Sequence, residues 1–250
     1  MAWITTPDGE YRIESLSAAN LSGALKIIRE DFFQDEVYCF ATEVYKNPLA
    51  AEELLELCAD AALDGVSLVA VATVSGEVAS VIFNKLQEAP SDSSEKTFFE
   101  IFSEQRCKQA SSRAVVDVMA EFDAELNIYG RYGVDCWLEL MFLGTHRQHR
   151  RKGLGNLLCK TSQEVAKKLN SGPVAPMTIE DLGPKYAFMT PRKPITKVPK
   201  LCSGLWTTIG SQKIGRALGF TVLVTFPLKD RIFEGKSFSE KGVVNFCEGA

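Results

Sequence analysis

The stretch Arg150-Arg151-Lys152-Gly153-Leu154-Gly155 decides the fold, because of the segments on either side of it. The apolar run 136–143 before it has the composition of a buried strand, and an amphipathic helix follows it. One face of that helix carries Leu154, Leu157, Leu158, Thr161, Val165 and Leu169. A glycine turn entering a helix N-terminus leaves backbone N–H groups unpaired at the positive end of the helix dipole. The sequence therefore predicts a strand, a phosphate-binding turn and a helix.

Other phosphate-binding motifs do not match this turn. The order G-x-G-x-x-G of the dinucleotide fingerprint is absent, and no Lys-Ser or Lys-Thr follows the glycines as in a P-loop. The basic residues around the turn have a second interpretation, as a nucleic-acid or nuclear-import patch. These residues are His146, Arg147, His149, Arg150, Arg151 and Lys152. The glycines lie where the strand meets the helix, and the basic cluster ends there, which favours a phosphorylated coenzyme.

The whole chain has the composition of a globular protein. Its 250 residues are 46% hydrophobic and 24% charged. We expect a cytoplasmic protein without membrane contact, because neither a basic apolar leader nor an apolar run of about 20 residues occurs. The net charge of -4 argues against bulk nucleic-acid binding. Seven cysteines without a C-x-x-C pattern, and two histidines in a basic run, predict neither a disulfide framework nor a metal site.

Hydrophobic periodicity and turn residues predict alternating strands and helices. We expect strands at 11–16, 66–74, 78–86, 136–143, 200–203, 220–227 and 243–246. We expect helices at 18–33, 48–63, 111–128, 154–169 and 210–218. The proline-rich stretch at about 171–199 is a loop or insertion and a candidate lid. This order predicts one α/β domain over residues 1–250, with a mixed sheet.

At this point the chain resembles a known family. An apolar strand, an R-x-x-G-x-G turn and an amphipathic helix form the acetyl-coenzyme A motif of the GCN5-related N-acetyltransferase (GNAT) superfamily. A second stretch, from Ser211 to Phe220, is similar to the family's helix that ends in Leu-Gly-Phe and closes the coenzyme site. The resemblance implies an α/β (α+β) GNAT fold with a mixed, mainly antiparallel central sheet. Helices flank that sheet, which is splayed at the strand ending near Leu143.

The resemblance also implies which residues bind acetyl-CoA. They are Leu143, Gly144, Thr145, Arg150, Arg151, Lys152, Gly153, Leu154 and Gly155. In the family the amide at the position of Leu143 faces the thioester carbonyl, the strand end pairs with pantetheine, and the turn holds the pyrophosphate. Many members protonate the leaving thiolate with a tyrosine at the position that is Gly215 here. Trp206 either lines the amine pocket or packs in the core.

Within the superfamily, Asp31-Phe32-Phe33-Gln34-Asp35-Glu36 resembles the F-F-x-D-E sequence of the insect arylalkylamine N-acetyltransferases. The glutamate of that sequence is the general base, which implies that Glu36 accepts the proton of the amine. The insect proteins continue with Pro-Leu, whereas this chain has Val37-Tyr38, so the amine stays open. They also carry two hydroxyl residues four positions apart, which Thr207 and Ser211 match; a helix cap is the alternative role of Ser211.

These resemblances predict a monomeric enzyme that transfers an acetyl group directly from acetyl-CoA to a small primary amine. The first candidates are the arylalkylamines dopamine, serotonin, tyramine and octopamine. Agmatine or a polyamine as acceptor, a longer acyl donor, and protein acetylation are alternatives. A regulatory protein that binds acyl-CoA without turnover is the alternative outside enzymes.

Overall fold

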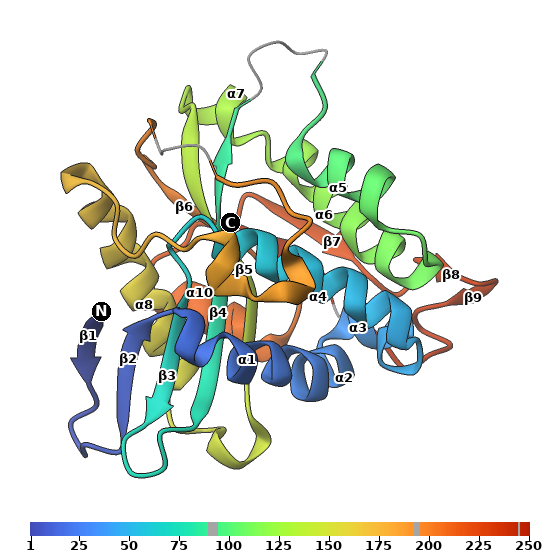
Figure 1. Cartoon of the computed structure of the whole chain (residues 1–250). Coiled ribbons are helices and arrows are strands. Elements are labelled where there is room, and N and C mark those ends of the chain that lie inside the picture. Colours follow the sequence, from blue (N-terminus) through green and yellow to red (C-terminus); the bar gives the residue numbers. More distant parts are fainter. Residues whose placement is uncertain (90–94, 193–195, 245) are drawn as a thin grey trace. The chain divides into compact units, whose positions relative to one another are not determined.

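Figure 1 shows the computed structural model of the chain, which describes residues 1–89, 95–192, 196–244 and 246–250. Contacts within the chain divide it into two compact units. The first unit comprises Met1–Phe32, Leu55–Gln87 and Cys136–Cys202. The second unit comprises Phe33–Leu54, Glu88–Asp135 and Ser203–Ala250. Helix α4 (Pro48–Ala62) contributes residues to both units.

The first unit is built on a sheet with the strand order β1-β2-β3-β4-β5. Its strands are β1 (Ala2–Thr5), β2 (Tyr11–Ser15), β3 (Leu68–Ala72), β4 (Val78–Glu88) and β5 (Cys136–Thr145). β3 is antiparallel to β2, with Tyr11 opposite Ala72, and antiparallel to β4. Gly76, with φ +73°, turns the chain between β3 and β4, a conformation that glycine adopts without strain. The hairpin predicted here is confirmed.

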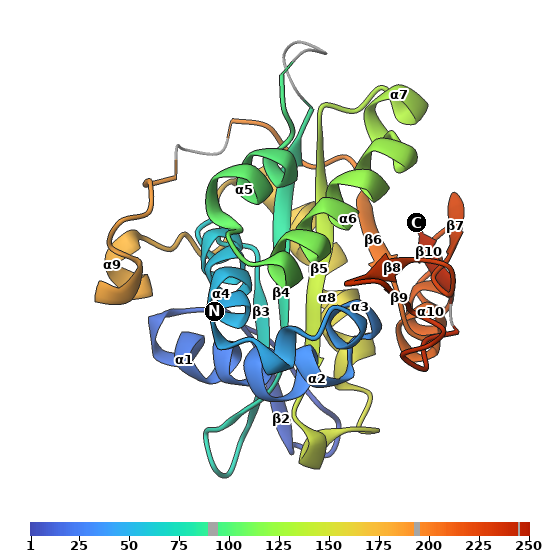
Figure 2. The same cartoon turned by 90° about the vertical axis from the view of Figure 1, so that its right-hand side faces the viewer.

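Helices cover both faces of this sheet. α1 (Ala18–Ile27) and α8 (Leu154–Lys168) lie on opposite faces (Figures 1 and 2). The predicted apolar face of α8 is buried at Leu154, Leu158 and Val165. Beneath α8, the Asn84 side chain of β4 donates to the Ser162 hydroxyl at 2.8 Å, which pairs two buried polar groups. The predicted order of strand, turn and helix is therefore confirmed.

Shorter helices complete the first unit. A π-helical turn, Ile28–Phe32, continues α1. The proline-rich stretch contains α9 (Ile179–Leu182) and a 3-10 turn at Pro184–Tyr186, and residues 193–195 within it lie outside the described residues. Further 3-10 turns are Arg147–His149 and Leu169–Ser171. Short turns of this kind join the larger elements without adding to the sheet.

In the second unit, β10 (Phe246–Gly249) lies between β6 (Cys202–Trp206) and β7 (Val224–Pro227) and is antiparallel to both. A two-stranded hairpin pairs β8 (Ile232–Phe233) with β9 (Lys236–Ser237). The helices are α2 (Phe33–Asp35), α3 (Val37–Ala41), α5 (Phe98–Arg106), α6 (Ala110–Leu126), α7 (Ile128–Tyr132) and α10 (Ile209–Ala217), with a 3-10 turn at Val44–Lys46.

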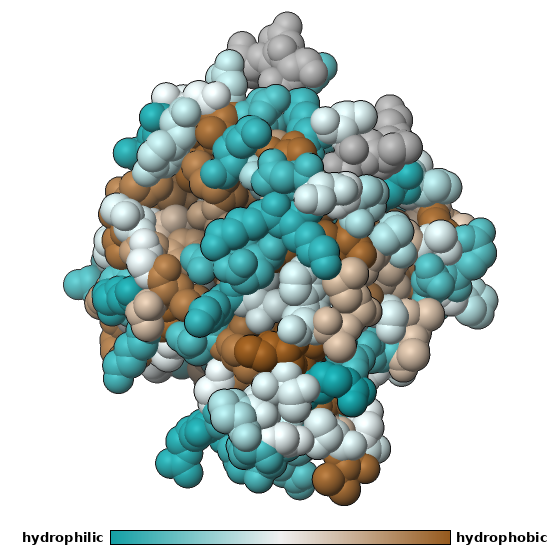
Figure 3. All heavy atoms as spheres, turned by 90° about the vertical axis from the view of Figure 1, so that its left-hand side faces the viewer, coloured by the Kyte–Doolittle hydropathy of each residue, from teal (hydrophilic) through white to brown (hydrophobic). Residues whose placement is uncertain are grey.

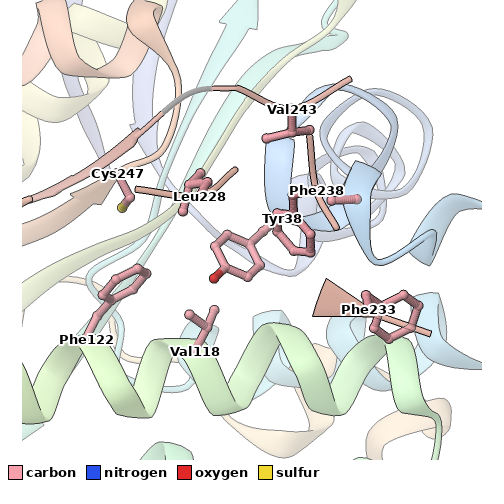
Figure 4. Close-up of a cluster of buried hydrophobic side chains, with 9 residues drawn as sticks. Tyr38, Val118, Phe122, Leu228, Phe233, Phe238, Val243 and Cys247 are labelled. Carbon is pink, nitrogen blue, oxygen red and sulfur yellow. The ribbon is translucent and has the colours of Figure 1, made fainter. Parts of the chain in front are cut away.

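Figure 4 shows an apolar cluster of the second unit, in which distant segments of the chain meet. Its members are Tyr38, Ala41, Val118, Phe122, Leu228, Phe233, Phe238, Val243 and Cys247. The Tyr38 ring meets Phe122 and Phe238 edge to face, with centroids 6.4 and 5.1 Å apart, an arrangement that aromatic rings prefer. Because Tyr38 follows Glu36 by two residues, this cluster anchors the segment that carries Glu36.

Some boundaries differ from those expected from sequence. β6 and β10 begin later than the strands expected at 200–203 and 243–246, and α5 was not predicted. Long-range pairing sets β6, because Gly204 and Ala250 exchange backbone hydrogen bonds of 2.7 and 3.1 Å. α5 begins at a capping box formed by Thr97 and Glu100, a local signal that the sequence does contain.

Among the described residues, no helix is both long and apolar enough to cross a bilayer. On the face shown in Figure 3, hydrophobic side chains form separate areas among hydrophilic ones. Scattered exposed apolar side chains are ordinary on folded proteins.

A buried ionic network fastens the proline-rich stretch within the first unit. One oxygen of Asp64 accepts hydrogen bonds from Lys85 Nζ at 2.8 Å and from the Leu86 N–H at 2.9 Å. Its other oxygen accepts from Arg192 Nε at 2.6 Å, and Arg192 also donates to the Asp60 carbonyl at 2.9 Å. The Asp64 and Lys85 side chains are only 5% and 7% exposed. Arg192 therefore ties its segment to α4 and β4.

Replacing Asp64 with alanine should lower the free energy of unfolding by about 3–5 kcal/mol, because it leaves a buried ammonium group without its carboxylate. Urea unfolding at neutral pH measures the change. Glu104→Ala is the control, since Glu104 pairs with Lys96 at an exposed site and should contribute less than about 1 kcal/mol. If Asp64→Ala lowers the free energy of unfolding no more than the control does, the network is not shielded from water.

Candidate functional site

The first residues of β5 direct their backbone groups to the segment that leads into β6. The Leu138 N–H donates to the Leu201 carbonyl at 3.0 Å, and the Cys136 carbonyl accepts from the Lys200 N–H at 3.1 Å. Residue numbers increase in the same direction along the two paired segments, so residues 200–201 run parallel to the start of β5. At the beginning of β5, the backbone N–H and C=O groups of even-numbered residues therefore point to this segment.

At the end of β5, the backbone groups of even-numbered residues point to the opposite edge of the strand, toward β4. The His146 N–H donates to the Ala79 carbonyl of β4 at 2.9 Å, and the Gly144 carbonyl accepts from the Ser80 hydroxyl of β4 at 2.8 Å. In a regular strand, residues an even number apart offer their backbone groups to the same edge. The switch between Leu138 and Gly144 therefore requires a one-residue irregularity, of the kind that a β-bulge introduces.

This irregularity turns the backbone of Leu143 and Thr145 away from β4. The Thr145 carbonyl, accordingly, accepts from Arg150 Nε at 3.2 Å rather than from a residue of β4. The predicted pairing partners of pantetheine, Leu143 and Thr145, thus lie at the place on β5 where the ladder with β4 leaves their backbone groups available. Gly144, between them, is buried.

Close packing fixes the end of β5. A Cβ atom at Gly144 would lie 3.0 Å from Ile27 Cγ2 and 3.4 Å from Ile28 Cδ1, so the π-helical turn approaches the strand backbone directly. The rings of Phe32 and Phe142 pack edge to face, with their centroids 5.3 Å apart. Glycine at position 144 therefore permits this close packing, in addition to any role toward a ligand.

The basic loop after β5 is held by a carboxylate. Asp31 Oδ1 accepts hydrogen bonds from the Arg147 N–H and from Arg147 Nε, both at 3.1 Å, and from Arg150 Nη2 at 3.4 Å. His149 Nδ1 lies 2.9 Å from the Tyr11 hydroxyl. The loop is therefore anchored to both the π-helical turn and β2, and His149 is engaged in that anchorage.

The glycine turn has the backbone geometry of an anion site. Arg151 and Gly153 have φ angles of +61° and +77°, and Gly153 caps α8 without a side chain that bonds the first amides. Successive amides around such a left-handed turn converge on one point, where the helix dipole adds positive potential. Arg151, Lys152 and Gly153 are exposed, and Lys152 Nζ pairs with Glu10 at 3.0 Å. These residues fit a diphosphate group.

In the second unit, the structure brings together two of the predicted catalytic residues. Glu36 is the N-cap of α3: Oε2 accepts from the Cys39 N–H at 2.8 Å. Its other oxygen, Oε1, accepts from the Thr207 hydroxyl at 2.6 Å. Glu36 is half-buried, so its carboxylate is held in one orientation by two donors and remains partly accessible.

Ser211 has a different environment. Thr208 is the N-cap of α10, and the Ser211 N–H donates to the Thr208 hydroxyl at 3.1 Å. In return, the Thr208 N–H donates to the Ser211 hydroxyl, also at 3.1 Å. The structure thus places Ser211 in a capping box, the alternative role expected from its position, whereas Thr207 contacts Glu36.

Trp206 fills the space beside Gly215. A Cβ atom at Gly215 would lie 2.9 Å from both Cε2 and Nε1 of the Trp206 indole. The indole is buried, meets Phe220 edge to face at 5.2 Å, and its Nε1 has no hydrogen-bond partner among the described residues. Trp206 therefore packs in the core, and its bulk accounts for glycine at position 215.

Sequence analysis missed an ionizable residue, Glu139 in β5. Its side chain is 2% exposed and accepts a hydrogen bond from Gln87 Nε2 at 2.6 Å. Burial raises the pKa of Glu139 to about 7, although the Gln87 hydrogen bond and the charge of Lys85 lower it. A single acid inside the apolar run 136–143 was the signal available in the sequence.

Tyr38 is a second polar group that sequence analysis did not assign. Its hydroxyl is buried and has no hydrogen-bond partner among the described residues. Burial raises the pKa of Tyr38, and the charge of Glu36 adds to the shift, while Arg231, 5.9 Å from the ring, opposes it. An aromatic residue with an unsatisfied hydroxyl thus lies within the electrostatic range of Glu36.

No protein-family model matches the sequence, and no curated protein sequence matches it. Arylalkylamine N-acetyltransferase 2 from Aedes aegypti superposes on the chain with a TM-score of 0.70, 19% identity and 96% of each chain covered. This chain has the GNAT fold.

Two further GNAT structures agree with this result. A variant of agmatine N-acetyltransferase superposes with a TM-score of 0.68 and 12% identity, covering 96% of this chain and 97% of its own. Drosophila melanogaster polyamine N-acetyltransferase gives 0.63 and 12%, covering 96% and 98%. The predicted fold class, a mixed and mainly antiparallel sheet flanked by helices, is confirmed.

The titration of Glu139 should make stability depend on pH. The native state keeps the proton of Glu139 between the ordinary glutamate value of 4.5 and about 7, so its contribution to stability falls as pH rises through that range. Relative to Glu139→Gln, the wild-type free energy of unfolding should fall by about 2.5 kcal/mol between about pH 5 and about pH 8. Urea unfolding across this range measures the difference, and parallel profiles would refute the raised pKa.

The contact between Gly215 and Trp206 predicts a second effect on stability. Gly215→Ala should cost about 1–3 kcal/mol in free energy of unfolding, because the added methyl group overlaps the indole. Gly210→Ala on the same helix is the matched control: its nearest neighbour would be Thr208 Oγ1 at 3.8 Å, so the better helix former should be neutral or stabilising. Equal effects of the two variants in thermal unfolding would contradict the packing described.

Proposed function

We propose that this protein transfers an acetyl group from acetyl-CoA to a small primary amine. The observation that carries the proposal is the Glu36 carboxylate, held between the Cys39 N–H and the Thr207 hydroxyl in a chain with the GNAT fold. A glycine turn suited to a diphosphate supports it independently. The coenzyme residues belong to the first unit, and the Glu36–Thr207 pair belongs to the second.

The coenzyme supplies an activated acetyl thioester. In this proposal the amides of residues 151–155 bind its diphosphate, and the basic side chains of Arg151 and Lys152 add positive charge. Leu143 and Thr145 pair with the pantetheine arm through the backbone groups that face away from β4. The Leu143 N–H donates to the thioester carbonyl oxygen, which gains negative charge as the amine attacks.

Glu36 acts as the general base. A primary amine is protonated at neutral pH and cannot attack until a carboxylate accepts its proton, directly or through water. The Thr207 hydroxyl and the Cys39 N–H fix the orientation of that carboxylate. The new carbon–nitrogen bond then replaces the carbon–sulfur bond of the thioester. Because Gly215 offers no hydroxyl and the single Thr207 hydroxyl proton is donated to Glu36, the thiolate leaves without a side-chain donor and takes its proton from solvent.

Among amines, the proposal favours arylalkylamines. The structures that superpose on this chain are named for arylalkylamine, agmatine and polyamine acetylation, so the fold accommodates each class. The sequence from Asp31 to Glu36, which resembles the F-F-x-D-E sequence of the insect arylalkylamine N-acetyltransferases, supports an arylalkylamine as acceptor. Dopamine, serotonin, tyramine and octopamine are therefore the first amines to test, ahead of agmatine.

The test measures thiol release from acetyl-CoA in the presence of each amine. Glu36→Gln should lower kcat/KM by about 100-fold or more, because the amide cannot accept the proton. Thr207→Val should cost about tenfold by removing one hydrogen bond to the base. Asp35→Asn is the matched control: it removes the neighbouring exposed carboxylate and should change kcat/KM by less than about threefold.

Two outcomes would contradict parts of the proposal. If CoA binds and no amine increases thiol release, the protein binds acyl-CoA without turnover, and the enzyme proposal fails. If Glu139→Gln abolishes turnover while Glu36→Gln retains it, the base is Glu139, whose pKa of about 7 suits proton transfer near neutral pH.

A further inference from the structure

Asp31 is a buried carboxylate beside a loop proposed to serve an anion. It lies in the π-helical turn Ile28–Phe32, and its side chain is 2% exposed. Its Oδ1 atom accepts from the Arg147 backbone, the Arg147 side chain and the Arg150 side chain. The Arg147 Nη2 group also donates to the Glu30 carbonyl at 3.0 Å. This one turn therefore holds the loop through four hydrogen bonds.

The same loop connects the end of β5 to the glycine turn. Arg150 Nε donates to the Thr145 carbonyl, while its Nη2 donates to Asp31. Arg150 therefore spans the strand end and the π-helical turn, and the next residues are Arg151 to Gly153, whose amides form the diphosphate cradle. A change in the conformation of residues 147–150 would therefore displace the amides that follow them.

Charge alone would oppose an acid at this place. A carboxylate near an anion site lowers the positive potential that the ligand meets, and burial weakens the screening by water. A favourable effect of Asp31 must therefore be structural. Three donors converge on Asp31 Oδ1, and they fix the backbone at Arg147 and the direction of the Arg150 side chain.

We propose that Asp31 is a positioning residue for the diphosphate arm of acyl-CoA: it holds the Arg147–Arg150 loop in the conformation that presents the amides of residues 151–155. The inference rests on the proposed function for the identity of the ligand. Arg150 then acts as a tie within the protein, and the backbone amides make the contacts to the diphosphate. Asp31 touches neither the amine nor the reacting atoms in this assignment.

Calorimetric titration with CoA tests the proposal without requiring turnover. Asp31→Ala removes the acceptor and should raise the CoA dissociation constant by about tenfold, whereas Asp31→Asn keeps one acceptor oxygen and should fall between it and the wild type. Glu30→Gln is the matched control, since it removes the same charge from the adjacent residue, whose side chain is 51% exposed, and should change the constant by less than about twofold.

Loss of a counter-charge and loss of a positioning contact would change the affinity for CoA in opposite directions. If Asp31 serves only as a counter-charge, both of its variants will bind CoA more tightly, which would overturn the proposal, as would unchanged affinity in Asp31→Ala. Thermal unfolding of each variant identifies any general loss of structure; Asp31→Asn, which preserves shape, keeps the test valid if Asp31→Ala unfolds.

Comparing two acyl donors distinguishes a role of Asp31 at the diphosphate from a general role in the enzyme. For the active enzyme, Asp31→Ala should raise KM for acetyl-CoA with little change in kcat, and should leave kcat/KM for acetyl-pantetheine, which lacks the diphosphate, within about twofold of wild type. Equal losses with both donors would contradict a role through the diphosphate. If neither donor is turned over by the wild-type protein, the proposed reaction fails, and the CoA titration still decides the role of Asp31.

Discussion

Strand β5 changes the edge to which its even-numbered residues offer backbone hydrogen bonds, from residues 200–201 at Leu138 to β4 at Gly144. A regular strand has no such switch, because its backbone groups alternate with a period of two. The one-residue irregularity aligns the start of β5 with the segment leading to β6 and its end with β4. As a consequence, Leu143 and Thr145 direct their backbone groups away from the β4 ladder, and a ligand could use them.

The packing of the first unit depends on the same strand end. The end of α1 and the π-helical turn pack so closely on Gly144 that an added Cβ atom would lie 3.0 Å from Ile27, and Asp31 of that turn then bonds the loop that follows β5. A π-helical turn shifts the residues after it relative to an α-helix, so it can present both a packing surface and a carboxylate to one strand end. Strand, turn and loop form one connected structure, and the glycine turn before α8 continues from it.

Two of the three acids in the motif Asp31 to Glu36, its first and last residues, have different environments. Asp31 is buried and bonded to arginine side chains and backbone, whereas Glu36 is half-buried and bonded to an amide and a hydroxyl. A carboxylate surrounded by arginines is committed to structure, while one with a neutral donor on each oxygen is oriented and remains able to accept a proton. Two carboxylate side chains within six residues thus suit different tasks.

Much of the fold was predictable from local patterns. The hairpin at Gly76, the start of α4 at Asn47-Pro48, and the order of β5, glycine turn and α8 rest on periodicity and turn residues, which act over a few positions. The limits of β6 and β10 were not predictable in this way, because their mutual pairing joins residues more than 40 positions apart. The pairing of Glu36 with Thr207, across 171 positions, is of the same kind.

The sequence by itself indicated most of the regular elements and the residues proposed for the candidate site, since both follow from side-chain chemistry at short spacing. Only the tertiary structure decided which hydroxyl meets Glu36, that Trp206 requires glycine at position 215, and that Glu139 is buried with a raised pKa. Each of these depends on distance and solvent exposure between segments far apart in the chain. Hydrogen bonding, overlap and desolvation act through space, and a linear pattern of residues does not contain those distances.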